Sequence, residues 1–163
     1  MEYRYAALNK NDVVNGEGIC VSFWVQGCPH HCSGCFNPET WNFKGGFPLP
    51  ENIKEQICMA LVANGVQRNL SILGGEPLCP ENRELVKDII KYVRMRFPHI
   101  KIFIWTGYLL EDLQKENNDT INFILSKINF LIDGPFIKEQ KDLTLKWRGS
   151  TNQRIHHMNY IGI

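Results

Sequence analysis

Short apolar strand patterns alternate with helical patterns along most of this chain. The strand patterns cover 20–26, 70–73, 100–105 and 130–133, and helical spacing of apolar residues lies between them, over 53–62, 81–96 and 109–126. This alternation predicts a parallel sheet with helical crossovers. The chain has 163 residues, whereas a complete eight-stranded barrel needs about 250. We therefore expect an α/β fold, a partial (β/α) barrel or open sheet that is mainly parallel, in one domain over 1–163.

Each predicted strand ends in an unusual loop. A long loop begins at Gly27, and GGEP (74–77), TGY (106–108) and DGP (133–135) follow the later strands. Ligands of parallel α/β folds bind at the carboxyl ends of the strands. These loops should therefore meet at one edge of the sheet and form the functional site.

Composition excludes several classes of protein. No run of eighteen apolar residues is present, which argues against a membrane span, and the first residues lack the apolar core of a secretory signal, so we expect a cytoplasmic protein. Eighteen basic residues against seventeen acidic ones give no electrostatic case for nucleic acid. Six cysteines without a signal peptide favour metal or redox chemistry over disulfides.

Three of these cysteines, Cys28, Cys32 and Cys35, lie within eight residues. Their spacing lets one loop wrap a cubane cluster, with each sulfur on a different iron. A [4Fe–4S] cluster normally takes four cysteines, so three would leave one iron open for substrate. Structural zinc with His30 or His31 as fourth ligand is the main alternative, and unrelated buried thiols are the third. Cys20 and Cys58 are expected in the core, and Cys79 is left open.

The turn Gly74-Gly75-Glu76-Pro77 supplies two residues without side chains and one carboxylate. The glycines would let a ligand approach the backbone, and Glu76 can accept a hydrogen bond from a ligand ammonium group. A tight strand-to-helix turn explains the motif equally well. Gly107 and Asp133 are weaker candidates for a pocket and are more typical of turn formers. The loop aromatics Phe36, Trp41 and Phe43 would cover a cluster or pack beneath the loop.

The cysteine triplet after a first strand and GGEP after a later one resemble the radical S-adenosylmethionine superfamily. Further motifs resemble the activating proteins of anaerobic ribonucleoside-triphosphate reductases, which are glycyl-radical activating enzymes. These motifs are NGEG (15–18), VQGC (25–28), CFNPETW (35–41), WTGY (105–108), DGPF (133–136) and WRGSTNQRI (147–155).

The resemblance implies a role for each matching residue. Cys28, Cys32 and Cys35 would hold three irons of one [4Fe–4S] cluster, and the fourth iron would bind S-adenosyl-L-methionine. Gly34 and Phe36 would line the adenine side through backbone contacts, and Cys35 between them would also belong to the cofactor site. The methionine amino group would lie at the glycine turn, on Gly74, Gly75 and Glu76. No side-chain acid or base is expected to be catalytic.

The resemblance also implies a reaction. Reductive cleavage of S-adenosylmethionine would give a 5′-deoxyadenosyl radical, which would abstract hydrogen from a glycine of the reductase. The implied partners are the large glycyl-radical subunit of anaerobic ribonucleoside-triphosphate reductase and a one-electron donor such as flavodoxin or ferredoxin. Two rival functions are a radical enzyme acting on a small molecule and a noncatalytic zinc or iron–sulfur module.

Overall fold

The computed structural model describes residues 2–162 and has a seven-stranded sheet in the order β3-β1-β2-β4-β5-β6-β7. The four central strands, β2, β4, β5 and β6, are mutually parallel, while β1, β3 and β7 pair antiparallel at the two sides. The strands are β1 (Arg4–Asp12), β2 (Cys20–Val25), β3 (Phe47–Pro48), β4 (Asn69–Gly74), β5 (Ile102–Trp105), β6 (Phe130–Asp133) and β7 (Arg154–His157).

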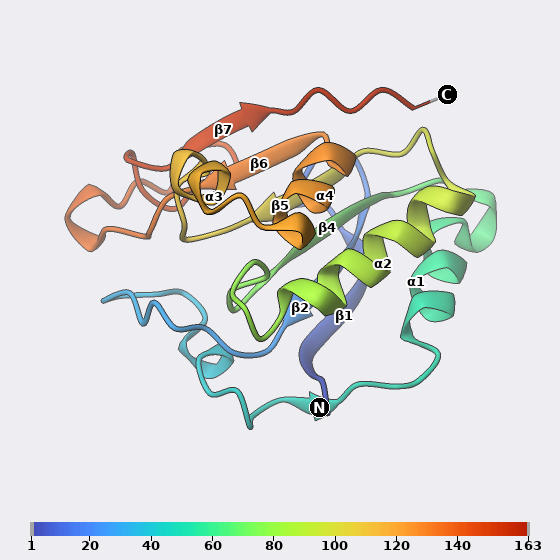
Figure 1. Cartoon of the computed structure of the whole chain (residues 1–163), viewed down its shortest axis with the longest axis horizontal. Coiled ribbons are helices and arrows are strands. Elements are labelled where there is room, and N and C mark those ends of the chain that lie inside the picture. The colour runs from blue at the N-terminus through green and yellow to red at the C-terminus, as the bar shows by residue number, and fades with distance from the viewer. Residues whose placement is uncertain (1, 163) are drawn as a thin grey trace.

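Four α-helices cover one face of the sheet (Figure 1). They are α1 (Ile53–Leu61), α2 (Arg83–Arg96), α3 (Leu110–Glu116) and α4 (Asp119–Lys127). Alternate residues of the central strands, among them Phe23, Ile72 and Ile104, form the hydrophobic core with the apolar stripes of these helices. None of the helices in the described part of the chain has the length and apolar character needed to cross a bilayer.

The predicted parallel centre and its helical crossovers are confirmed. The sheet is not closed, because its two sides end in the antiparallel strands β3 and β7. The sequence patterns did not predict β1, β3 or β7. Only the last residue of strand β1 is fully buried, so its sequence lacks the alternation of apolar and polar residues that marks a strand with one face in the core.

The opposite face of the sheet carries aromatic residues and is covered by loops. Phe103 stacks on Phe130 with ring centroids 4.9 Å apart, and Trp147, from the segment after β6, packs edge-on against Phe103 at 5.1 Å. The loops after β2 and β6 lie at the same side of the molecule (Figure 1). The strand-end loops therefore converge on the face that the four α-helices leave uncovered.

Candidate functional site

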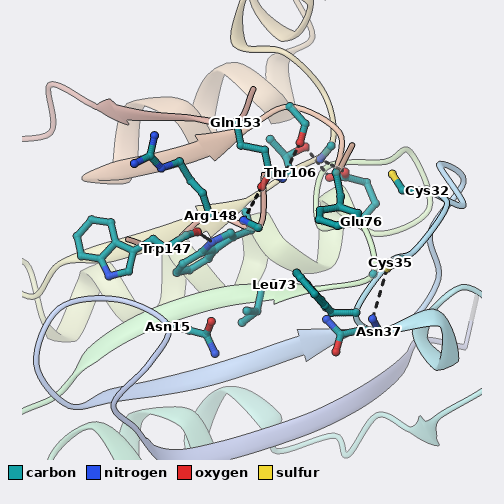
Figure 2. A pocket seen from close by; sticks show the side chains of 18 of the residues that line it. Asn15, Cys32, Cys35, Asn37, Leu73, Glu76, Thr106, Trp147, Arg148 and Gln153 are labelled. Carbon is teal, nitrogen blue, oxygen red and sulfur yellow. Dashed lines mark hydrogen bonds between the residues drawn. The ribbon is translucent and has the colours of Figure 1, made fainter. Parts of the chain in front are cut away.

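One cavity of about 570 Å³ opens at the carboxyl ends of the parallel strands, on the face without helices. Its walls come from the loop after β1, the cysteine loop, the glycine turn after β4, the end of β5 and the long segment after β6. Figure 2 shows side chains from these segments around one space, with Cys32 and Cys35 at the right of the view and Trp147 at the left. The loops expected at one edge of the sheet do meet.

The three clustered cysteines all line this cavity. Cys35 Sγ already accepts the backbone N–H of Asn37 at 3.4 Å, and the backbone N–H of Cys28 donates to the carbonyl of Trp41 at 3.1 Å. Burial raises the pKa of the Cys28 thiol, although backbone N–H groups of His30 and His31 oppose that effect. The structure thus gathers three soft sulfur ligands on one wall.

The other three cysteines lie elsewhere. Cys20 and Cys58 are buried in the body of the fold, as expected. Cys79 is fully buried, and its thiol donates to the carbonyl oxygen of Glu76 at 3.2 Å. Burial, and then the nearby charge of Glu76, raise the pKa of Cys79 to about 12, so this thiol stays protonated and is not a ready metal ligand.

The donor set fits an iron–sulfur cluster. Within residues 2–162, no three His, Cys, Asp or Glu side chains form a group able to hold a metal ion as they stand. A cubane makes a different demand, because each of its cysteine ligands binds a separate iron. Three thiols from one loop, which line the same cavity as the glycine turn, are donors of the kind that bind such a cluster.

Glu76 is the most heavily bonded side chain of the site, and it is 1% exposed. Its Oε1 accepts from His30 Nε2 at 2.7 Å and from the backbone N–H of Gly107 at 2.7 Å. Its Oε2 accepts from Thr106 Oγ1 at 2.7 Å and from the N–H of Leu78 at 2.9 Å. The carboxylate that we expected to receive a ligand ammonium group therefore already binds four protein donors.

The glycines of this edge allow close packing of the backbone. A Cβ on Gly75 would overlap the carbonyl oxygen of Gly27, and one on Gly74 would meet the backbone of Val25. A Cβ on Gly107 would lie 2.6 Å from the His30 ring. At all three positions a side chain would overlap neighbouring protein atoms. Glycine is therefore needed for the ends of the strands and the cysteine loop to pack this closely.

The structure places most of the predicted cofactor residues at the cavity. Cys35, Phe36, Gly74, Gly75 and Glu76 line it, whereas Gly34 does not. A Cβ on Gly34 would instead contact the side chains of Lys138 and Phe136, each at 3.3–3.4 Å. Gly34 therefore faces the segment after β6 rather than the cavity.

Sequence reasoning missed the residues that build the far wall. Trp105 Nε1 donates to the carbonyl of Trp147 at 2.7 Å, and Trp147 Nε1 donates to the carbonyl of Gly16 at 3.1 Å. Gln153 Oε1 accepts the N–H of Gly149 at 2.8 Å. The motifs NGEG, WTGY and WRGSTNQRI contain these residues, but none of the motifs indicated that the residues bond to one another across the sheet.

Asp133 lies just outside the cavity and ties β6 to β7 and α3. It is fully buried and accepts from the N–H of Leu110 at 2.8 Å and from Arg154 at 2.6 Å. Burial alone would raise the pKa of Asp133, but the hydrogen bonds from Arg154, Leu110 and His156 outweigh it and hold this pKa below its ordinary value. The buried carboxylate of Asp133 therefore stabilises the fold and does not line the cavity.

Comparison with known proteins agrees with this geometry. A family described as "4Fe-4S single cluster domain" matches residues 14–156. The anaerobic ribonucleoside-triphosphate reductase-activating protein of Haemophilus influenzae is 39% identical over 153 residues, which cover 93% of this chain and 96% of that protein. The protein of the same name from Escherichia coli K12 is 36% identical over 148 residues, covering 90% and 94% of the two chains.

The chain belongs to the family of anaerobic ribonucleoside-triphosphate reductase-activating proteins. A member encoded by the phage T4 is 38% identical over 146 residues, which cover 88% of this chain and 87% of the phage protein. The resemblance drawn from the sequence motifs is therefore confirmed at the level of the family. The match to a single-cluster [4Fe–4S] domain also confirms the expected class of metal centre.

Proposed function

We propose that this chain activates an anaerobic ribonucleoside-triphosphate reductase as a radical S-adenosylmethionine oxidoreductase. Its 163 residues would form one domain of that type, with the open sheet as a partial barrel. One observation carries the proposal. In a member of this family, Cys28, Cys32 and Cys35 line the same cavity as the turn of Gly74, Gly75 and Glu76.

The cysteines would hold one [4Fe–4S] cluster through three of its irons. The cluster and S-adenosyl-L-methionine, when bound at these residues, would supply the chemistry of reductive sulfonium cleavage, and a glycine of the reductase would be the hydrogen donor. A one-electron donor such as flavodoxin or ferredoxin would reduce the cluster. A cytoplasmic location would bring these partners together.

The protein groups would bind and orient the cofactor. Because the Glu76 carboxylate already accepts four hydrogen bonds, the backbone of Gly74 and Gly75 is the better candidate to receive the methionine amino group. Glu76 would fix that backbone by joining it to the next strand. Gly34 and Phe36 would contact the adenine from the cysteine loop.

The reductase would enter where exposed apolar side chains surround the cavity. Val13, Val14, Phe36 and Leu143 all line it, yet each is at least 50% exposed. They come from three separate segments, namely the loop after β1, the cysteine loop and the segment after β6. Exposed apolar side chains grouped in this way are typical of a protein-binding surface. We call these four residues the apolar rim.

Anaerobic reconstitution tests the proposed function. The purified chain would be loaded with iron and sulfide, reduced, and supplied with S-adenosylmethionine. We expect iron to load, 5′-deoxyadenosine to appear, and a glycyl-radical electron paramagnetic resonance signal to develop once reductase is added. Bound zinc in place of iron, or a reduced cluster that leaves the cofactor intact, would refute the proposal.

A further inference from the structure

One buried hydrogen-bond donor of the described chain has no partner. Among residues 2–162, the buried side-chain nitrogen and oxygen atoms without a hydrogen bond are Trp41 Nε1 and His156 Nε2. The His156 nitrogen nevertheless lies 3.0 Å from Asp133 Oδ2. An indole N–H can only donate, and a buried donor left unpaired is costly enough that it calls for a functional or structural reason.

Among the four tryptophans, Trp41 alone has an indole N–H without a hydrogen-bond acceptor in the described residues. The other three tryptophans of the chain all donate within the protein. Trp24 donates to Ser22 Oγ at 3.1 Å, and the indoles of Trp105 and Trp147 bind carbonyl oxygens at 2.7 and 3.1 Å. All four tryptophans line the same cavity, so a shared polar environment does not explain why only Trp41 is unpaired.

Trp41 is held firmly against the cysteine loop. Its carbonyl oxygen accepts the N–H of Cys28 at 3.1 Å, and its own N–H donates to the carbonyl of Pro38 at 3.2 Å. Its ring stacks on the imidazole of His31, with centroids 4.7 Å apart and planes at 13°. These contacts hold Trp41 in the cysteine loop, in the wall of the cavity that the three thiols also line, and its indole N–H has no acceptor among the described residues.

We propose that Trp41 Nε1–H donates a hydrogen bond to a sulfur of the iron–sulfur cluster or of its cysteine ligands, and so raises the reduction potential of the cluster. The inference rests on the proposed function, which places a cluster at these cysteines. Cys35 Sγ already accepts the N–H of Asn37, so the loop has one N–H to sulfur bond without any cluster. The added electron increases negative charge on the sulfurs, and a donor stabilises that reduced state.

The decisive variant replaces Trp41 with 3-benzothienylalanine, which keeps the bicyclic ring and removes only the N–H. Trp41→Phe is the second variant, and 3-benzothienylalanine in place of Trp24 is the matched control, because Trp24 lines the same cavity but donates to Ser22. Each protein is reconstituted anaerobically, and its iron content and midpoint potential are measured first without and then with S-adenosylmethionine.

We expect all of these proteins to load iron as wild type does. Both Trp41 variants should show a lower potential, by about tenfold in the reduction equilibrium, which is about 59 mV for one electron. The Trp24 control should keep the wild-type potential. An unchanged potential in the loaded benzothienyl variant, or a shift that requires S-adenosylmethionine, overturns this inference alone. A wild-type protein that takes up no iron overturns the proposed function as well.

A second measurement needs no noncanonical amino acid in place of a tryptophan. Electron–nuclear double resonance on the reduced protein, labelled with nitrogen-15 in its tryptophan indoles, should detect a nitrogen coupled to the cluster. Trp41→Phe should remove that coupling, and Trp24→Phe should leave it. Absence of the coupling in wild type contradicts the proposed hydrogen bond.

Discussion

His30 Nε2 lies 2.7 Å from Oε1 of Glu76, which joins the cysteine loop to the turn after β4. The same carboxylate accepts from Thr106 and Gly107 at the end of β5. One buried group thus fixes three loops that come from distant parts of the sequence. Glu76 therefore holds the three loops of the site in place relative to one another.

Replacing Glu76 with Gln tests this role. The amide would face at least one of the four donors with an N–H group, so we expect the free energy of unfolding to fall by about 1–3 kcal/mol. Binding of S-adenosylmethionine should weaken because the turn loses its link to β5. Urea unfolding and calorimetric titration measure the two effects. Glu81→Gln, at an exposed position shortly after the same turn, is the control, and equal stability of the two variants would contradict this role.

The cluster assignment predicts a sharp difference among the cysteines. Replacing Cys28, Cys32 or Cys35 with Ala should abolish formation of 5′-deoxyadenosine, because each removes one of three iron ligands. Cys58→Ala removes a thiol buried on α1 and should cost only about 1 kcal/mol of stability. Iron analysis and a cleavage assay compare the four variants. Full activity in Cys32→Ala would rule the assignment out.

Asp133 makes stability depend on pH. Its pKa in the folded protein is below the ordinary value, which is about 3.9 in an unfolded chain. The stabilisation is therefore complete above about pH 5 and is lost as the pH falls through the lower, folded-state pKa. Asp133→Asn should be about 1–3 kcal/mol less stable than wild type at pH 7, and the two proteins should converge in acid.

Unfolding by urea at a series of pH values measures this dependence. Asp88→Asn, at an exposed position on α2, is the matched control and should follow the wild-type curve. A constant difference between wild type and Asp133→Asn across the acid range would show that the charge of Asp133 is not responsible.

The apolar rim predicts where the reductase binds. Val14→Asp and Leu143→Asp each place a charge on an apolar surface and should weaken binding to the reductase about 5- to 30-fold, or about 1–2 kcal/mol. Met95→Asp is the control, because Met95 is 75% exposed at the end of α2, away from the cavity. Titration of the anaerobic, cluster-loaded chain with reductase measures the affinities. Equal loss in all three variants would indicate a general charge effect.

Much of the site could be predicted because it follows from strand order. Once β2, β4 and β5 are parallel neighbours, the cysteines after β2 and the glycine turn after β4 must share an edge. The local sequence was sufficient to predict where these residues lie, because both segments follow directly after a strongly apolar strand.

The rest of the site depends on contacts that no local pattern encodes. Trp147 binds the carbonyl of Gly16 across 131 positions of sequence, and its backbone adopts a left-handed φ of 58° that few non-glycine residues take. The four donors of Glu76 likewise come from three loops. Such long-range bonds are set by tertiary packing, so the far wall and the role of Glu76 required the structure.

The helices cover a single face, and this has a consequence for how the reaction is confined. The cavity of the site opens on the side of an unclosed sheet that is covered by loops and carries none of the four α-helices. Under the proposed function, a reactive carbon radical must be shielded from solvent on every side, and the docked reductase would complete that shielding. Turnover of cofactor without that second protein should therefore be wasteful, with solvent or buffer molecules taking the place of the intended glycine.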